Sequence, residues 1–301
     1  MKRLSAPGLR SAFVWTTVLA ALVASIPSLH AQGRAECSVV SSRILGHPVR
    51  YCAFLPASFD KDKTRHYPVI YYLHGLGDNE QSLLNTGGWD MVSELRSQGK
   101  IGEFIILAPS GGHTFFINSA NGKVRYEDFF MKEFMPQMEK KYRAEGTRAT
   151  RGIMGISMGG YGALHYAFKY PDDFAVVSAE MPALIPELPM NMSTGPGSPA
   201  AILGDVFGTP FNRDYFEHNS VFYFARADSA ASLRRLKIYF IVGADDDYGF
   251  EQGAEKLNQL LTQRDITHEF HVYPGRHSIE FAVRYFPDAL EFQWRAIGVK
   301  K

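Results

Sequence analysis

Short apolar runs alternate with longer amphipathic stretches along most of this chain. The first two runs, Ser38–Ile44 and Val49–Phe54, flank a turn around Gly46 and predict an antiparallel hairpin. The later runs have the length of strands and end in turn residues or helical patterns. These further predicted strands are Pro68–Leu73, Glu103–Ala108, Arg151–Ile156, Phe174–Ser178, Lys237–Val242 and Thr267–Val272.

Helical periodicity fills the stretches between the apolar runs. It is strongest over residues 126–143, where Phe129, Phe130, Phe134 and Met138 recur at helical spacing. Alternating strands and helices indicate crossover units, so we predict an α/β fold with a mostly parallel central sheet, helices on both faces and an N-terminal antiparallel hairpin. Other predicted helices are Met91–Arg96, Met158–Tyr170, Gly253–Gln263 and one that begins near Ser278.

The segment Pro182–Arg235 departs from this alternation, because it lies between two predicted strands and is rich in Pro, Gly, Met and Phe. We predict a helical insertion over the edge of the sheet, around residues 182–235, inside one domain that spans residues 32–301. A substrate-binding cap and a packing excursion both remain open for this insertion.

Residues 1–31 have the order typical of a secretory signal peptide. They begin with three basic side chains, continue in an apolar run from Ala12 to Ile26 and end at the small residue Ala31. The apolar run has about 15 residues, fewer than the roughly 20 that span a bilayer. We therefore expect a secreted or periplasmic protein without an integral membrane segment after cleavage, with an uncleaved N-terminal anchor as the alternative.

Composition and charge narrow the function classes. The chain has 301 residues, of which 46% are apolar and 21% charged, which is typical of a globular protein. Removing residues 1–31 takes away three positive charges and no negative ones, so the formal net charge changes from +1 to −2. Without a basic surplus to hold phosphates, we expect no nucleic-acid partner.

Cys37 and Cys52 are the only cysteines and flank the predicted hairpin. An oxidising compartment permits a disulfide between them, and closing a 15-residue loop would stabilise the fold by about 3 kcal/mol. Two buried free thiols are the alternative.

The run Gly155-Ile156-Ser157-Met158-Gly159 matches the nucleophile elbow, G-x-S-x-G, of the α/β-hydrolase fold. A strand must turn there at once into a helix. Side chains in place of the two glycines would clash with neighbouring segments of the same polypeptide. The exposed Ser157 hydroxyl then lies at a helix N-terminus, where negative charge is favoured. A Gly-rich helix start without chemistry is the alternative.

A serine hydroxyl becomes a good nucleophile only beside a base. In this fold an acid and a histidine follow the serine, in that order, in loops after later strands. The run Asp245-Asp246-Asp247 follows one predicted strand and His277 follows the next, at the same sheet edge as Ser157. The residues favour Asp246 as the acid and leave Asp245 and Asp247 open.

Acyl transfer also needs N–H donors for the developing oxyanion. The best candidates are Met158, directly after the nucleophile, and Leu76, in the Gly-rich turn after the strand Pro68–Leu73. His74 in that turn is interpreted as structural. Two aromatic residues near the same edge, Phe115 and Phe116, either line a substrate pocket or pack within their loop.

No metal or other cofactor is expected. His268 and His271 lie three apart on a predicted strand and therefore point to opposite faces. The acidic run at 245–247 gives too little geometry for a dedicated calcium loop.

Together these features resemble the esterase D family of α/β hydrolases. This family includes feruloyl and acetyl-xylan esterases, tributyrin esterases, S-formylglutathione hydrolases and mycolyltransferases. The resemblance covers nearly the whole chain after residue 31. It is carried by Tyr72-Leu73-His74-Gly75, Gly155-Ile156-Ser157-Met158-Gly159-Gly160-Tyr161-Gly162-Ala163, Gly243-Ala244-Asp245-Asp246 and Pro274-Gly275-Arg276-His277-Ser278.

The resemblance implies a catalytic triad of Ser157, Asp246 and His277, with Leu76 and Met158 as oxyanion donors. The family's spacing between glycine and acid is what selects Asp246. One departure is that a tryptophan often follows the catalytic histidine in the family, whereas Ile279-Glu280-Phe281 stands there in this chain.

We therefore expect an exported serine carboxylic-ester hydrolase that forms an acyl-enzyme and needs no cofactor. Its substrate would be a small-molecule or polysaccharide-linked ester with a short acyl, acetyl or feruloyl group. Two alternatives are an acyltransferase with a sugar or alcohol acceptor and a catalytically silent binding fold.

Overall fold

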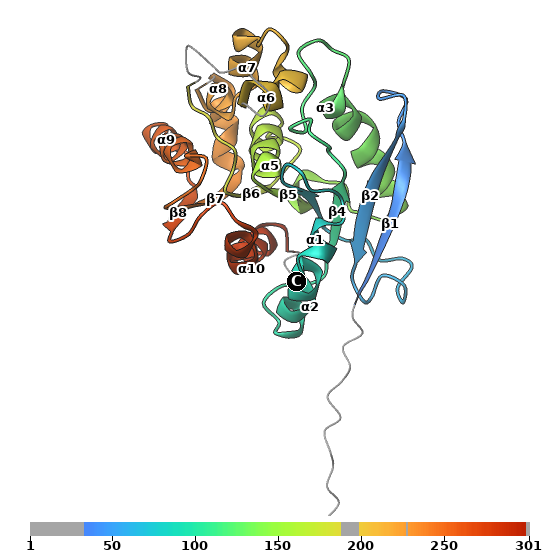
Figure 1. The fold of residues 1–301 in the computed structure, drawn as a ribbon. Coiled ribbons are helices and arrows are strands. Elements are labelled where there is room, and N and C mark those ends of the chain that lie inside the picture. Colours follow the sequence, from blue (N-terminus) through green and yellow to red (C-terminus); the bar gives the residue numbers. More distant parts are fainter. Residues whose placement is uncertain (1–32, 188–198, 227, 299–301) are drawn as a thin grey trace, which may run out of the picture. The chain divides into compact units, whose positions relative to one another are not determined.

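The computed structural model describes residues 33–187, 199–226 and 228–298. The predicted signal peptide at 1–31 lies outside the described residues, as does part of the predicted insertion. The described strands form one eight-stranded sheet in the order β1-β2-β4-β3-β5-β6-β7-β8 (Figure 1). They are β1 (Arg34–Ser41), β2 (Pro48–Leu55), β3 (Val69–Leu73), β4 (Ile105–Pro109), β5 (Arg151–Ile156), β6 (Val176–Glu180), β7 (Lys237–Gly243) and β8 (Glu269–Tyr273).

The sheet is parallel from β4 to β8, and the antiparallel pairs are β1 with β2 and β2 with β4. This confirms the predicted fold class.

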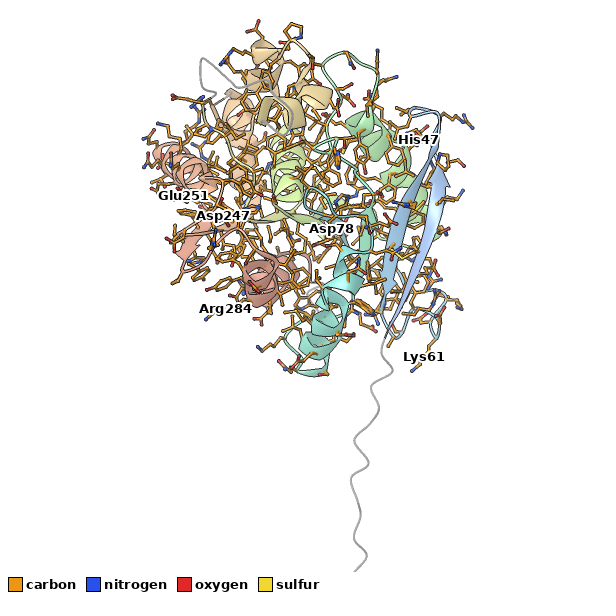
Figure 2. The ribbon with its side chains drawn as sticks, viewed as in Figure 1. His47, Lys61, Asp78, Asp247, Glu251 and Arg284 are labelled. Carbon is orange, nitrogen blue, oxygen red and sulfur yellow. A yellow bond between two sulfur atoms is a disulfide. The ribbon has the colours of Figure 1, made fainter. Side chains whose placement is uncertain are left out.

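The hairpin turn carries His47 (Figure 2), and a disulfide joins Cys37 to Cys52 at directly opposed positions of β1 and β2. The first strand begins at Arg34, four residues before the predicted start, because it pairs with β2 up to Leu55. That pairing uses backbone groups, which an apolar pattern does not reveal.

Helices cover both faces of the sheet. The apolar side chains of α2 and α10 pack on one face, and those of α5 and α9 pack on the other (Figure 1). The described helices are α1 (Ser82–Asn85), α2 (Gly88–Ser97), α3 (Tyr126–Phe129), α4 (Met135–Lys141), α5 (Met158–Lys169), α6 (Pro199–Phe207), α7 (Arg213–Asn219), α8 (Val221–Arg226), α9 (Phe250–Gln263) and α10 (Ile279–Ile297).

The helix predicted over residues 126–143 is not uniform. Between α3 and α4 the residues Phe130–Phe134 form a π-helical turn. Pro136 follows in the first turn of α4, where its missing N–H and its ring are incompatible with a regular hydrogen bond to the residue four positions earlier. A widened turn accommodates this proline while the apolar face stays continuous.

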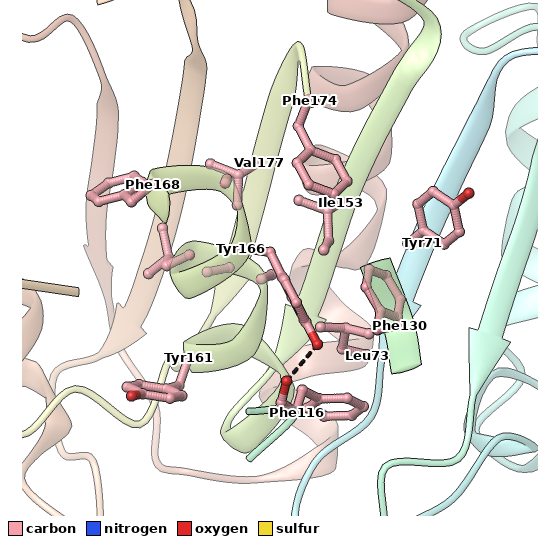
Figure 3. Packing of buried hydrophobic residues seen from close by; sticks show 14 of the residues in the cluster. Tyr71, Leu73, Phe116, Phe130, Ile153, Tyr161, Tyr166, Phe168, Phe174 and Val177 are labelled. Carbon is pink, nitrogen blue, oxygen red and sulfur yellow. Dashed lines mark hydrogen bonds between the residues drawn. The ribbon is translucent and has the colours of Figure 1, made fainter. Parts of the chain in front are cut away.

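Helix α5 is the centre of the larger core. All of its residues except the last are buried. The ring of Tyr166 packs on the ring of Phe130, with the two centroids 4.5 Å apart. The Tyr166 hydroxyl donates a hydrogen bond to the carbonyl of Phe116, as Figure 3 shows. The helix directly after Ser157 is therefore packed within the core.

Between β6 and β7 the described chain forms α6, α7 and α8, followed by a 3-10 segment (Asp228–Arg235). A backbone carbonyl of this part is hydrogen-bonded to α5, and the Phe224 ring of α8 also packs edge-on against His165 of α5. The carbonyl of Asn219 accepts a hydrogen bond from the Tyr161 hydroxyl at 2.8 Å and lies 3.0 Å from His165 Nδ1. The extent of the insertion, 182–235, stays a prediction because residues 188–198 lie outside the described part.

Glu180 has a buried carboxyl group and a backbone contact with Ser157. Glu180 ends β6, its backbone carbonyl accepts the Ser157 N–H at 2.9 Å, and its side chain is 1% exposed. Neither carboxyl oxygen has a hydrogen-bond partner in the described structure. Burial therefore raises the pKa of Glu180 well above its ordinary value of 4.5, and the negative charge of Asp288 adds to the rise.

We predict that Glu180→Gln flattens the pH dependence of stability. The native wild type holds a proton on Glu180 that the unfolded chain releases above pH 4.5, so its free energy of unfolding decreases as pH rises through that range. The expected slope difference is about 1.4 kcal/mol per pH unit, measured by urea unfolding between pH 5 and 8. Exposed Glu217→Gln is the control, and equal slopes for wild type and Glu180→Gln would contradict the prediction.

Candidate active site

Ser157 stands at the junction of β5 and α5 in a backbone conformation that few residues adopt, with φ 55° and ψ −116°. The two glycines of the motif make this junction possible. A Cβ on Gly155 would lie 2.3 Å from the carbonyl oxygen of Gly159, and a Cβ on Gly159 would lie 2.0 Å from the carbonyl oxygen of Leu73. Either atom would overlap backbone, so the close approach requires glycine at both positions.

The structure brings Ser157, His277 and Asp246 together in one hydrogen-bonded line. His277 Nε2 lies 2.9 Å from Ser157 Oγ, and His277 Nδ1 lies 2.8 Å from Asp246 Oδ2. A carboxylate only accepts, so the imidazole proton is on Nδ1 and the lone pair of Nε2 faces the serine hydroxyl. This is the arrangement in which a histidine can take the serine proton.

Asp246 is the one of the three adjacent aspartates that turns inward. Its side chain is fully buried, and Oδ1 accepts the backbone N–H groups of Tyr248 and Phe250 at 3.0 and 3.3 Å. Burial alone would raise the pKa of Asp246, but the hydrogen bond from His277, together with those backbone donors, holds the pKa below its ordinary value of 3.8. The carboxylate is therefore charged and fixed at neutral pH.

The other two aspartates point elsewhere. Asp247 forms an ion pair with Arg276 at the surface, and Asp245 is exposed while its backbone N–H binds the carbonyl of Gly275.

The proposed oxyanion turn after β3 lies against the nucleophile. A Cβ on Gly75 would be 3.7 Å from the Ser157 Cβ, and Leu76 and Met158 both line the same cavity as Ser157. Met158 is the first residue of α5, so its N–H has no partner within the helix.

His74 holds this turn in place. Its Nε2 accepts the backbone N–H of Gly111 at 2.9 Å, and its Nδ1 lies 2.8 Å from the carbonyl oxygen of Gly75. Burial lowers the pKa of His74 below its ordinary value, in keeping with a neutral ring that donates from Nδ1. The side chain is 1% exposed and ties the oxyanion turn to the loop after β4.

A cavity of about 1100 Å³ opens beside Ser157 and His277. Its walls are mostly apolar side chains from both sides of the sheet edge. One wall comes from the region of α1, α2 and α10, and includes Leu83, Met91, Ile156, Ile279, Ala282 and Phe286. The opposite wall includes Phe115, Ala183, Leu184, Leu203, Tyr248 and Phe250. Such a volume slightly exceeds the range of roughly 300–1,000 Å³ that is typical of small-molecule sites.

The two aromatic residues predicted to bind substrate differ in position. Phe115 lines the cavity, whereas Phe116 is fully buried, with its ring 5.4 Å from His74 and 5.5 Å from Tyr126. The prediction for Phe116 is therefore corrected. Both residues have positive φ, 52° and 60°, which turns the second ring away from the cavity.

Sequence reasoning missed the contribution of Tyr248 and of the start of α10. The Tyr248 ring packs edge-on to His277 with centroids 4.9 Å apart, and Phe250 does the same at 5.4 Å. Ile279, in the stretch after His277, lines the cavity and is 55% exposed. No local pattern marks these residues, because they reach the site only through the loops that carry the acid and the base.

Within residues 33–187, 199–226 and 228–298, no group of three or more His, Cys, Asp or Glu side chains could hold a metal ion. No described helix is both long and apolar enough to cross a membrane.

Several known proteins are similar to this chain in sequence. A family model described as putative esterase matches residues 42–291. An esterase of Mycobacterium tuberculosis is 27% identical over 228 residues, which are 71% of this chain and 49% of that protein. The chain thus spans about half the length of this relative. An acetyl esterase of Caldicellulosiruptor saccharolyticus is 24% identical over 84% of this chain and 94% of that protein.

Solved structures show the same likeness. A ferulic acid esterase superposes with a TM-score of 0.77 at 28% identity, covering 89% of this chain and 99% of that chain. An S-formylglutathione hydrolase from Agrobacterium tumefaciens has a TM-score of 0.71 at 20% identity, covering 89% and 97%, and shares the fold.

We predict that Asp246→Asn lowers kcat for p-nitrophenyl butyrate about ten-thousand-fold, because an amide in place of the carboxylate favours the wrong imidazole tautomer. Exposed Asp245→Asn is the matched control and should stay within about twofold of wild type, since surface changes have small effects. Steady-state kinetics on the three proteins, with circular dichroism to verify folding, measures the difference. If Asp245→Asn lost most of its activity and Asp246→Asn did not, the acid would be Asp245 and the prediction would be wrong.

Proposed function

Since the chain belongs to the esterase family whose model matches residues 42–291, we propose that it is an exported serine carboxylic-ester hydrolase that works through an acyl-enzyme on Ser157. The observation that carries the proposal is the hydrogen-bonded line from Asp246 through His277 to Ser157, which ends at a large apolar cavity. The esterase relatives support the same reaction class.

In the first half of the proposed reaction, His277 Nε2 takes the proton of Ser157 Oγ while that oxygen attacks the ester carbonyl carbon. Asp246 stabilises the imidazolium that forms. The carbonyl oxygen becomes negative and is held by the backbone N–H groups of Leu76 and Met158, each worth about 3 kcal/mol in the transition state. His277 then gives its proton to the departing alcohol oxygen, which leaves the acyl group on Ser157.

In the second half, water takes the place of the alcohol. His277 removes one proton from the water, whose oxygen attacks the acyl carbon through the same oxyanion site. The bond to Ser157 Oγ breaks, the proton returns to that oxygen, and the free acid departs. No cofactor enters either half.

Export is supported by two independent features. The N-terminal 31 residues have the order of a secretory signal. The disulfide between Cys37 and Cys52 suits an oxidising compartment, because cytosolic thiols are kept reduced.

Hydrolysis of p-nitrophenyl acetate and butyrate by the protein without residues 1–31 tests the reaction. We expect turnover by the wild type, covalent labelling by a fluorophosphonate probe, and loss of both in Ser157→Ala, with kcat lower by about a million-fold. Equal activity in wild type and Ser157→Ala would place the nucleophile elsewhere. Inactivity of both, without labelling, would favour the silent fold.

Expression of the full chain in a bacterium tests export. We expect the protein in the periplasm or medium with Gln32 as its new N-terminal residue, determined by mass spectrometry, because cleavage follows a small residue. Replacing Lys2, Arg3 and Arg10 by Glu should keep the chain in the cytosol. A cytosolic, uncleaved wild-type chain would refute export.

A further inference from the structure

His165 is a buried histidine that takes no part in the proposed reaction. It lies on α5, about two turns after Ser157, and is 0% exposed. Its ring has polar partners on two other helices. Nδ1 lies 3.0 Å from the carbonyl oxygen of Asn219, at the end of α7, and Nε2 lies 3.1 Å from Oε2 of Glu127, on α3.

Both partners of the ring accept hydrogen bonds. A backbone carbonyl has no hydrogen to donate, so Nδ1 carries the hydrogen of that contact. Glu127 is ionised, because Lys169 Nζ lies 2.6 Å from its Oε1 and the Tyr170 hydroxyl donates to the same oxygen. Burial opposes this charge, but the hydrogen bond with His165 and the nearby Lys169 lower the pKa of Glu127 to about 2. A carboxylate only accepts, so Nε2 carries a second hydrogen.

With a hydrogen on each nitrogen, the ring is a positively charged imidazolium. A neutral ring would turn the lone pair of one nitrogen toward an oxygen lone pair at a fully buried position, which is unfavourable. The other groups around the ring are neutral or already paired. Burial raises the pKa of Tyr161 and Tyr166, so both hydroxyls stay protonated. The helix α8 contributes the ring of Phe224, and Asp128 on α3 is paired with two basic side chains.

The partner carbonyl connects the ring to the wall of the cavity. The carbonyl of Asn219 also accepts a hydrogen bond from the hydroxyl of Tyr161, which Figure 3 shows on α5. The Tyr161 ring lies 5.8 Å from the ring of Phe115, which lines the cavity. On α6, the ring of Phe207 lies 6.3 Å from Phe115 and 5.0 Å from Phe216 of α7. The position of α7 therefore bears on that wall.

We propose that His165 is an imidazolium in the folded protein, and that its two hydrogen bonds hold α7 against α3 and α5 and so fix the wall formed by Phe115 and Leu203. Leu203 lies on α6 and lines the cavity. His165 touches no reacting atom, so it is a positioning residue. Its charge follows from the hydrogen-bond geometry, whereas its effect on the substrate rests on the proposed esterase function.

Nitrogen NMR on isotopically labelled histidine tests the charge. A neutral ring gives one protonated and one unprotonated nitrogen, and an imidazolium gives two protonated ones. At neutral pH we expect two for His165, assigned by the loss of its signals in His165→Leu. In Glu127→Gln we expect one, because the amide donates to Nε2 and the ring becomes neutral. Glu217→Gln, exposed on α7, is the matched control and should keep both.

Kinetics on p-nitrophenyl acetate and octanoate test the effect on the wall. A longer acyl chain contacts more of the cavity, so a displaced wall should affect its binding most. We expect His165→Leu to raise KM for the octanoate about tenfold and to change kcat for either ester less than about threefold. Glu127→Gln should stay within about twofold of wild type, because both hydrogen bonds of the ring remain.

Tyr161→Phe covers the case in which His165→Leu does not fold. It removes one of the two hydrogen bonds to the Asn219 carbonyl and keeps the ring. We expect KM for the octanoate to rise about threefold. Circular dichroism verifies the folding of each variant.

Each part of the proposal has a result that would overturn it. An unprotonated nitrogen on His165 in the wild type would overturn the charge. An unchanged KM for the octanoate in the folded variants, or an equal fall in kcat for both esters, would overturn the role in the wall. A wild type that hydrolyses neither ester would refute the proposed function instead, and the NMR result would still decide the charge.

Discussion

The close approach of the β5–α5 junction to β3 is the constraint on which the rest of the site depends. No side chain fits at Gly155 or Gly159, since the carbonyl of Leu73 and the motif's own backbone occupy that space. The chain must therefore reverse within one residue, and Ser157 takes a conformation of the kind that costs about 1–3 kcal/mol. Neighbouring backbone offsets this strain, because the Ser157 N–H binds the carbonyl of Glu180. The hydroxyl is thereby raised above the sheet edge, beside the turn after β3.

The acid and the base depend on a similar close approach between the two loops that follow. A Cβ on Gly243 would lie 2.4 Å from the carbonyl oxygen of Gly275. Two backbone hydrogen bonds continue the β7–β8 ladder into the loops, from Ala244 to the carbonyl of Tyr273 and from Asp245 to that of Gly275. The loops that carry Asp246 and His277 are therefore joined through their backbones, directly beside the two side chains. A site whose geometry rests on backbone contacts is better pre-organised than one held by side chains alone.

The fold and the centre of the site could be predicted because their signals are local. Apolar runs that alternate with helical patterns predict the parallel sheet. The elbow around Ser157 is recognised from five consecutive residues. Three adjacent aspartates differ only in which way their loop turns, so the residues alone did not single out Asp246. Phe115 lines the cavity while Phe116 is buried in the core, and both have positive φ angles, which residue type alone does not predict. Tyr248 meets His277 only through tertiary structure, so no spacing in the sequence marks it.

Helix α5 links the reacting centre to the wall of the cavity. It begins directly after Ser157, and Tyr161 and His165, one and two turns later, contact the carbonyl of Asn219 in the segment between β6 and β7. His165 Nε2 also lies 3.1 Å from the buried carboxylate of Glu127. Burial opposes that charge, but His165 and the nearby Lys169 together lower the pKa of Glu127 to about 2. Because a buried charge without partners would be strongly unfavourable, this cluster fixes α3, α5 and α7 relative to one another. The helix that presents the serine is thus also bonded to the segment between β6 and β7, which contributes Leu203 to the opposite wall of the cavity.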